Sequence, residues 1–168
     1  MPAVSAWTFT PMTQADAEEI AGWHYPGEYA FYDADFIPES AGELLDPAQR
    51  GDQYHAARNA AGELEGFAQL EPVGGATEIG LGLRPDLTGR GLGQAFTEAV
   101  IDLARRHGAG RITLAVATFN ARAIRVYERC GFVETGRHVR RLGGRDWEFA
   151  DMELRSAPQS GSDPERNA

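Results

Sequence analysis

The apolar positions in the first part of the chain predict a strand, a helix and an irregular segment. Residues 7–10 alternate between apolar and polar as in a short strand, and Pro11 ends the alternation. Thr13 is suited to cap a helix that ends near Trp23. Residues 22–36, GWHYPGEYAFYDADF, show no period and combine many aromatic side chains with a Pro-Gly turn. We therefore expect a loop or a broken helix there.

The rest of the chain changes between strand patterns and helix patterns. Apolar residues alternate with polar ones over several short segments, whereas two longer segments repeat them at three- and four-residue spacing. A pair of glycines, Gly143-Gly144, is placed to join the last two strands. The expected strands are 53–58, 64–72, 77–83, 111–116, 132–139 and 147–154, and the expected helices are 91–107 and 120–131. This order predicts a mixed α/β fold, with a meander followed by two helix crossovers around a central strand.

The length and composition are those of one compact domain. The chain has 168 residues, of which 42% are apolar and 24% are charged, and this is enough for one hydrophobic core. No apolar run approaches the roughly 18 residues that span a membrane, and the N-terminus lacks the layout of a signal peptide. We expect a soluble, cytoplasmic protein with a domain over 1–155 and a disordered polar tail over 156–168.

The charged residues exclude several classes of function. All sixteen basic residues are arginine, and the lack of lysine excludes Walker-type phosphate loops, kinase-like ATP sites and Schiff-base enzymes. The net charge of −9 argues against nucleic-acid binding. Residues 1–80 carry a net charge of −12 and residues 81–168 a net charge of +3, which indicates a cationic partner for the first half and an anionic one for the second. The lone Cys130 cannot form an internal disulfide or a cysteine-based metal cluster, and no metal site is expected.

A glycine loop between a predicted strand and a predicted helix is the strongest chemical signal. The segment 83–96 reads LRPDLTGRGLGQAF, with glycines at every second position of its centre. Such a loop and the following helix N-terminus present backbone N–H groups that can hold a phosphate, although a flexible turn is the alternative. The dinucleotide fingerprint G-x-G-x-x-G fails in both registers, because Gln94 or Phe96 stands where the third glycine is needed.

Two motifs together resemble the GNAT acetyltransferases. The loop is similar to their pyrophosphate loop, (Arg/Gln)-x-x-Gly-x-(Gly/Ala), with Thr88, Gly91 and Gly93 at the fixed positions. Thr88 departs from the family pattern, and Arg90 is expected to supply the missing charge. The segment 120–132, NARAIRVYERCGF, matches the second GNAT signature, Asn-x-x-Ala-x-x-x-Tyr-x-x-x-Gly-Phe, at every fixed position. The resemblance implies a GNAT fold, in which helices flank a central, mostly antiparallel sheet with a splayed strand pair.

The resemblance also implies an activity and a cofactor site. GNAT enzymes transfer an acetyl group from acetyl-CoA to a primary amine by direct attack in a ternary complex. By this resemblance, Asn120 would hydrogen-bond the cofactor and Tyr127 would protonate the leaving thiolate, although an N-cap and a core residue are the alternatives. The two residues lie about 10 Å apart on one helical face. The acetyl-CoA site implied in this way comprises Leu81, Leu83, Thr88, Gly89, Arg90, Gly91, Gly93, Gln94 and Asn120.

The reaction needs a base, because an alkyl amine with a pKa of about 10.4 must lose a proton before it attacks. Glu78 is the first candidate, since it lies on the strand beside the implied carbonyl site, and Glu71, His24 and Glu28 are alternatives. With Glu78, the expected catalytic pair is completed by Tyr127. Cys130 is expected to be a buried or half-buried helix residue and not a nucleophile.

The aromatic segment 23–36 is the expected acceptor site. Aromatic faces interleaved with carboxylates, Asp35 among them, suit a cation, although core packing with a solvated acidic rim is the alternative. We expect a small cationic amine, with acetylation of a protein N-terminus or a non-catalytic acyl-CoA binding module as alternatives, and a monomer or homodimer. The expected acceptor-binding residues are Trp23, Tyr25, Glu28, Tyr29, Tyr32 and Asp33.

Overall fold

The computed structural model describes residues 6–34 and 38–155, which form one seven-stranded sheet. The strand order is β1-β2-β3-β4-β5-β7-β6, and among the described strands only β4 and β5 pair in parallel. This confirms the mixed, mostly antiparallel fold class. The predicted tail over 156–168 lies outside the described residues. The strands are β1 (Thr8–Pro11), β2 (Tyr54–Arg58), β3 (Leu64–Val73), β4 (Ala76–Leu83), β5 (Arg111–Ala117), β6 (Phe132–Leu142) and β7 (Arg145–Leu154).

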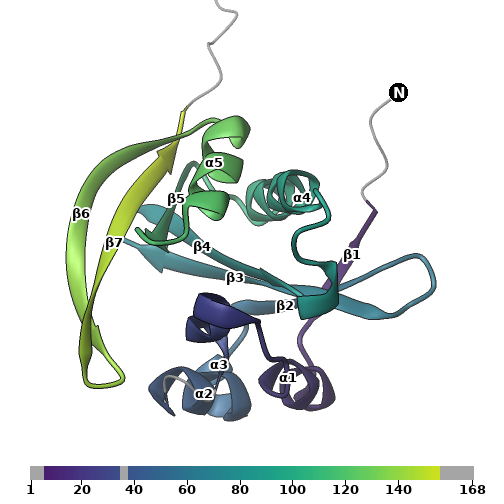
Figure 1. The fold of residues 1–168 in the computed structure, drawn as a ribbon. Coiled ribbons are helices and arrows are strands. Elements are labelled where there is room, and N and C mark those ends of the chain that lie inside the picture. Colours follow the sequence, from purple (N-terminus) through teal and green to yellow (C-terminus); the bar gives the residue numbers. More distant parts are fainter. Residues whose placement is uncertain (1–5, 35–37, 156–168) are drawn as a thin grey trace, which may run out of the picture.

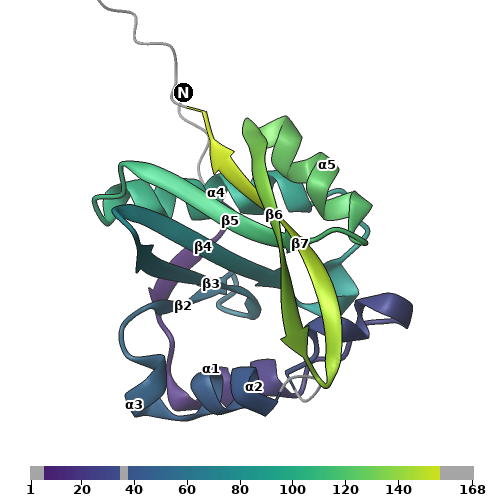
Figure 2. The ribbon, with the colours of Figure 1, turned by 90° about the vertical axis from the view of Figure 1, so that its left-hand side faces the viewer.

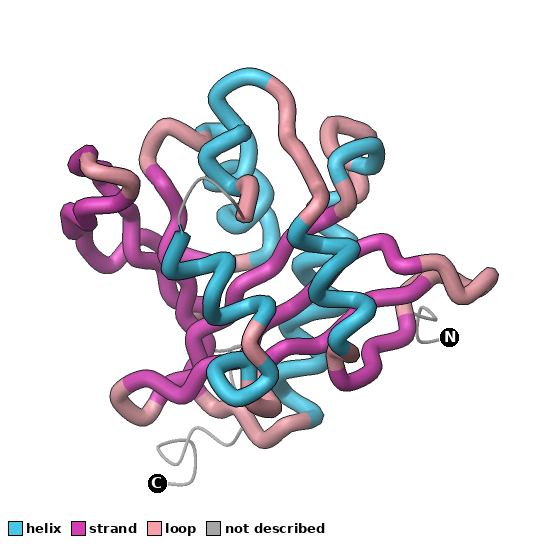
Figure 3. The backbone as a smooth tube through the Cα atoms, turned by 90° about the horizontal axis from the view of Figure 1, so that it is seen from below, coloured by secondary structure: helices cyan, strands magenta, loops and turns pink. Residues whose placement is uncertain are grey.

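Helices cover both faces of the sheet (Figure 1). On one face lie α4 (Gly93–Arg106) and α5 (Ala121–Cys130), and on the other lie α1 (Gln14–Ala21), α2 (Pro38–Leu45) and α3 (Pro47–Arg50). Figure 2 shows the same two layers of helices from the side, and Figure 3 shows helices lying across the strands when the molecule is seen from below. Of the helices that the structure describes, none combines the length and the apolar character that a membrane span requires.

The core between the sheet and α4 fixes the position of α4 on the sheet. Phe96, Val100 and Leu103 recur at helical spacing on α4 and are buried in one cluster with Ile112 and Leu114 of β5. Burial of each such side chain contributes about 1.5–3 kcal/mol. The packing holds α4 against the sheet, so that the N-terminus of α4 lies at the end of the loop that follows β4.

The strands β4 and β5 pair briefly and then separate. Within the described residues their parallel register ends at the pair Glu78 and Thr113. Beyond this pair, β4 stays paired with β3 as far as Leu83, while β5 stays paired with β7 as far as Ala117. The two strands therefore diverge within one sheet, and backbone N–H and C=O groups along both facing edges have no ladder partner there.

Several local details differ from the sequence-based expectation. The helix expected from residue 91 begins at Gly93, because Gly91 has a φ of +77°, which is incompatible with a right-handed helix. The last hairpin is longer than expected, since β6 reaches Leu142 and β7 starts at Arg145. The irregular segment contains one 3-10 helix, η1 (Gly27–Tyr32). The helices α2 and α3 were not predicted.

Candidate active site

The space between the separated strands opens into a cavity of about 570 Å³. Most of its walls come from the ends of β4 and β5, the glycine loop, the α5 helix and the aromatic segment, and β3, α4 and β7 also contribute lining residues. The predicted site residues that line it are Tyr25, Tyr29, Tyr32, Leu81, Leu83, Thr88, Gly89, Gly91, Gly93, Asn120 and Tyr127. The predicted residues outside its lining are Trp23, Glu28, Asp33, Glu78, Arg90 and Gln94.

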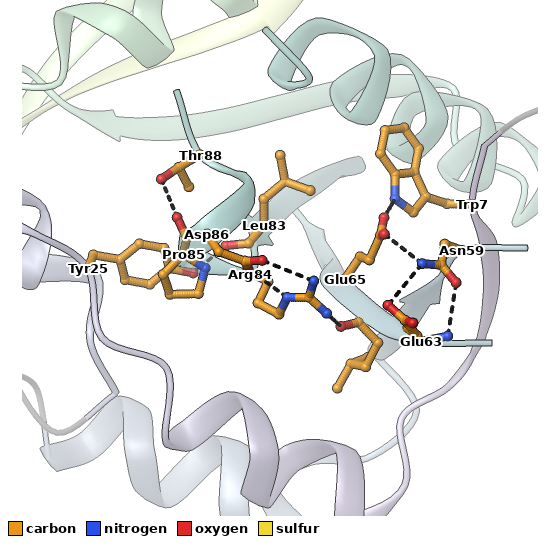
Figure 4. Close-up of polar contacts among 11 residues, drawn as sticks. Trp7, Tyr25, Asn59, Glu63, Glu65, Leu83, Arg84, Pro85, Asp86 and Thr88 are labelled. Atoms are coloured by element: carbon orange, nitrogen blue, oxygen red, sulfur yellow. Dashed lines mark hydrogen bonds and ion pairs between the residues drawn. The ribbon is translucent and has the colours of Figure 1, made fainter. Parts of the chain in front are cut away.

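The glycine loop has a backbone shape that depends on glycine at two positions. Gly89 and Gly91 have φ values of +74° and +77°, which side chains other than glycine rarely adopt. A Cβ atom at Gly91 would meet nothing within 4 Å, so the loop is open on that side. The Thr88 Oγ1 donates a hydrogen bond of 2.7 Å to the carbonyl of Pro85, in the short helix η2 (Pro85–Leu87). Figure 4 shows this contact, which ties the Thr88 side chain back to the loop itself.

The α4 helix begins at this loop without a capping side chain. Its N-cap residue is Leu92, whose side chain accepts no hydrogen bond from the N–H groups of the first turn. By contrast, the side chains of Thr13, Asp46 and Asn120 cap α1, α3 and α5. The first amides of α4 and the positive end of its dipole are therefore available to an anion beside the glycine loop.

The cationic residues near the loop differ from the expectation. Arg90 is exposed and lies outside the cavity lining, because the loop turns its side chain toward solvent. Arg122 and Arg129 of α5 line the cavity instead, and none of the described lining residues is a carboxylate. Sequence reasoning missed both arginines, since they occupy variable positions of the second motif. The seven-residue spacing between Arg122 and Arg129 places them on one helical face, and this is the signal in the sequence that joins them.

Asn120 and Tyr127 both line the cavity from α5. The Asn120 Oδ1 accepts a hydrogen bond of 3.1 Å from the backbone N–H of Ala123, so the residue is an N-cap, and its Nδ2 donates one of 3.0 Å to the Tyr32 Oη. The Tyr127 ring meets the Phe132 ring edge-on, with 6.0 Å between centroids. Burial, and then the neighbouring Tyr32, raise the pKa of Tyr127, so its hydroxyl keeps its proton at neutral pH.

Cys130 does not have the properties of a nucleophile. Burial, and then the negative charge of Glu98, raise the pKa of its thiol to about 11. The reactive form of cysteine is the thiolate, which is therefore scarce at neutral pH. Cys130 also lies outside the lining of this cavity.

The three tyrosines of the aromatic segment contact two different walls of the cavity. The Tyr25 Oη donates a hydrogen bond of 2.7 Å to the carbonyl of Leu83 at the end of β4, as Figure 4 shows. The Arg122 guanidinium lies 4.4 Å from the centroid of the Tyr29 ring, and Tyr32 accepts the hydrogen bond from Asn120. The segment is thus fixed to β4 at one end and to α5 at the other.

The other predicted acceptor residues have structural roles or lie elsewhere. Asp33 accepts a hydrogen bond of 2.7 Å from the backbone N–H of Tyr25 and lies 3.1 Å from the His24 Nδ1, so it fixes the turn of the segment. Trp23 is buried in the core formed with α1 and α2. Glu28 is exposed on η1. Asp35 lies outside the described residues.

Glu78 lies where β4 and β5 separate. It is the last β4 residue paired with β5, and it is two residues from Gly80, which lines the cavity. Directly across the antiparallel pair from Glu78 stands Glu71 of β3. Like charges in such a pair repel each other, and among the described ion pairs neither carboxylate has an arginine or histidine partner.

Comparison with known proteins gives a family match and several relatives. Residues 13–132 match the model of the acetyltransferase (GNAT) family. An L-methionine sulfoximine/L-methionine sulfone acetyltransferase of Pseudomonas aeruginosa is 32% identical over 124 residues, which cover 66% of this chain and 72% of that protein. A mycothiol acetyltransferase of Clavibacter michiganensis is 42% identical over 77 residues, 45% of this chain. The chain spans only 25% of the length of that relative in the match.

Solved structures show the same fold. The crystal structure of spermidine N-acetyltransferase from Vibrio cholerae, in complex with CoA and spermine, superposes with a TM-score of 0.68. The match covers 90% of this chain and 96% of that chain, at 20% sequence identity. A structure described as an acetyltransferase (GNAT family) from Bacillus anthracis superposes with a TM-score of 0.69 at 15% identity, over 89% of this chain and 94% of that one. At such identities the likeness concerns the arrangement of helices and strands.

Proposed function

This chain belongs to the acetyltransferase (GNAT) family, and we propose that it transfers an acetyl group from acetyl-CoA to the primary amine of a small molecule. The observation that carries the proposal is the cavity of about 570 Å³ in which the glycine loop, the separated strands and Tyr127 meet. Acetyl-CoA is the co-substrate in this account, and both substrates are bound when the amine attacks the thioester.

The chemistry of the loop end of the cavity fits a pyrophosphate. The open face of Gly91 and the uncapped N-terminus of α4 offer backbone N–H groups to an anion. Arg122 and Arg129 add two positive charges to the described lining, which has no carboxylate to oppose them. These features support a diphosphate ligand at this end and disfavour a cationic one.

The free edge of β4 fits the pantetheine arm and the acetyl group. Since β4 loses its β5 partner after Glu78, an extended amide-bearing chain can hydrogen-bond along residues 79–83. Backbone N–H groups near Leu81 and Leu83 are the proposed donors to the thioester carbonyl oxygen, where negative charge develops as the amine attacks. Acetyl-CoA supplies the thioester, and this chain supplies the fixed donors.

Two side chains are proposed to move the protons. As the C–N bond forms and the C–S bond breaks, the amine gives up a proton and the CoA thiolate gains one. Tyr127 is the proposed donor to the thiolate, because burial keeps its hydroxyl protonated. Glu78 is the proposed acceptor of the amine proton, through water, because it stands at the closed end of the space between β4 and β5 but outside the cavity lining.

The acceptor is proposed to be a small amine that carries positive charge. Glu71 and Glu78 repel each other across β3 and β4, and a cation beside them would relieve that repulsion. Glu43 of α2 adds a third carboxylate, which contacts Gln69, the residue opposite Gly80. Tyr25, Tyr29 and Tyr32 give the cavity flat aromatic faces that also favour a cation. The names of the relatives, which refer to small-molecule acetylation, support a small acceptor over a protein N-terminus.

A thiol-release assay tests the proposal. The chain is incubated with acetyl-CoA and, separately, spermidine, an aminoglycoside, methionine sulfone, an amino-acid ester and a peptide with a free N-terminus. We expect CoA release that depends on the amine and is fastest with a polycationic amine. Acetyl-CoA binding without release for any amine would support the non-catalytic binding module instead, and the fastest release with the peptide would make the acceptor a protein.

A further inference from the structure

Arg122 lies between the proposed phosphate site and the aromatic segment, beside the glycine loop and in contact with Tyr29. The position that a Cβ atom would take on Gly89 is 3.6 Å from the Arg122 Nη1, so the guanidinium is in van der Waals reach of the glycine loop. The carbon at the centre of the same guanidinium lies 4.4 Å from the centroid of the Tyr29 ring. Both Arg122 and Tyr29 line the cavity.

The charge of Arg122 has no internal counterion. Among the described residues, ion pairs engage eight carboxylates with other arginines or histidines, and none of these pairs includes Arg122. The Tyr29 ring packs against one face of the guanidinium but does not neutralise its charge. The planar N–H groups at its edges remain suited to the oxygen atoms of a phosphate.

The position of Tyr29 gives this contact a second consequence. Tyr29 belongs to η1, the part of the aromatic segment between Tyr25, which is tied to β4, and Tyr32, which is tied to α5. The Tyr29 ring packs on the Arg122 guanidinium and is also close enough to Tyr32 to raise the pKa of that tyrosine. A shift of the guanidinium would therefore remove one of the contacts that hold this ring in the wall.

We propose that Arg122 is a positioning residue that couples the two halves of the site. Its guanidinium pairs with the pyrophosphate of acyl-CoA and, stacked on Tyr29, fixes that ring in the wall of the acceptor end. This inference rests on the proposed acyl-CoA ligand and goes beyond it, because it assigns to one arginine both the phosphate charge that Thr88 and Arg90 do not supply and the order of the aromatic wall. Cofactor binding then prepares the acceptor site.

A double-mutant cycle measured by calorimetry tests the coupling without any turnover. The proteins are the wild type, Arg122→Gln, Tyr29→Leu and the double variant, and the ligands are CoA and pantetheine, which lacks the phosphates. Arg125→Gln is the matched control, since Arg125 is an exposed arginine on the same helix and lies outside the cavity lining. Arg122→Lys keeps the charge but loses the planar guanidinium, and thermal denaturation confirms that each variant is folded.

We expect Arg122→Gln to weaken CoA binding about 10- to 100-fold and to leave pantetheine binding within about twofold. Tyr29→Leu should weaken CoA binding about 2- to 5-fold in the wild type and have no effect when Arg122 is already replaced. Arg122→Lys should fall between the wild type and Arg122→Gln, and Arg125→Gln should match the wild type.

The outcomes separate the two proposals. A wild-type chain that binds neither CoA nor pantetheine overturns the proposed function and this inference with it. A wild type that binds CoA, with Arg122→Gln no weaker than Arg125→Gln, overturns the inference alone. Equal losses for CoA and pantetheine, or a Tyr29→Leu effect that persists without Arg122, would make Arg122 a packing residue and equally overturn the coupling.

Discussion

Tyr127 and Cys130 lie three residues apart on α5, and burial raises the pKa of both. The raised pKa has a different consequence for each residue, because a nucleophilic cysteine must lose its proton and a tyrosine acid must keep it. A cysteine works as a thiolate, so a pKa near 11 disables it, whereas a tyrosine that donates a proton must be neutral, and a raised pKa keeps it so. The environment of this helix therefore favours a general acid over a covalent nucleophile.

Replacement of Tyr127 by phenylalanine tests this role. A general acid contributes about 10²- to 10⁴-fold, so we expect turnover to fall by that factor while CoA affinity changes little. Because the pKa of Tyr127 is raised, wild-type turnover should show no loss from Tyr127 ionisation below about pH 10, the ordinary tyrosine value. Turnover equal to the wild type at every pH would assign Tyr127 to packing alone.

At the residue scale, motif spacing predicted residues that the structure places at the cavity, whereas residues that tertiary contacts bring there were not predicted. Thr88, Gly91 and Tyr127 were found from spacing, and all three line the cavity. Arg122 was missed, because its partners Tyr29 and Gly89 come from distant parts of the chain. Asp33 was expected to meet the acceptor, but the backbone N–H of Tyr25 and His24 already engage its two oxygens.

At the scale of elements, the glycines of β3 and β4 serve different purposes. A Cβ atom at Gly66 would lie 2.7 Å from the Gly82 carbonyl oxygen and 2.8 Å from the Phe96 ring, so the close packing of β3 on β4 and α4 requires a glycine. At Gly82 the Phe67 ring fills the space, with 2.5 Å to the Cβ position. At Gly80 the nearest atom is the Gln69 Oε1 at 3.4 Å, which is ordinary contact.

Alanine at Gly66 and alanine at Gly80 should therefore affect different properties of the protein. Gly66→Ala should destabilise the fold by about 1–3 kcal/mol, because backbone and a buried ring cannot move aside cheaply. Gly80→Ala should leave stability within about 0.5 kcal/mol and instead weaken acetyl-CoA binding, since Gly80 lines the cavity. Thermal denaturation and calorimetry measure the two effects. Equal stability losses would contradict the different roles of the two positions.

Most elements could be predicted because their side chains alternate or repeat over several turns. The helix α4 and the strands of the meander have clear periods, and the structure contains them close to the expected bounds. The helices α2 and α3 are short, and α3 has only four residues, so no period could develop. Their existence depends on packing against α1, where Leu44 joins Ala17 and Ile20 in a core.

At the scale of the whole molecule, the uneven charge of the chain has a structural counterpart. The charged residues in the described cavity lining are two arginines, and both come from the second half of the sequence. The carboxylates Glu43, Glu71 and Glu78 come from the first half and lie together with Gln69 around β3 and β4. The sequence could indicate two partners of opposite charge, and the fold adds that the arginines line the cavity whereas these carboxylates lie outside its lining.

The salt dependence of the acceptor KM tests this separation. We expect the KM of a cationic acceptor to rise with ionic strength and to rise about 2- to 5-fold in Glu71→Gln, because partly exposed ion pairs contribute up to about 1 kcal/mol. Glu98→Gln, an exposed charge on α4, is the control and should leave the KM unchanged. An acceptor KM that responds to neither salt nor Glu71→Gln would contradict a cationic acceptor at this face.

The central claim, that the cavity holds acyl-CoA with its pyrophosphate at the glycine loop, is tested most directly by calorimetric titration of acetyl-CoA. Three proteins are compared: the wild type, Gly91→Asp and Gly91→Asn. Both variants strain the same positive φ with a side chain of nearly equal size, and asparagine tolerates that conformation, so they differ mainly by one negative charge. We expect tight binding by the wild type, weakened binding by Gly91→Asn and none measurable by Gly91→Asp. Binding by Gly91→Asp as tight as that of the wild type would contradict the account.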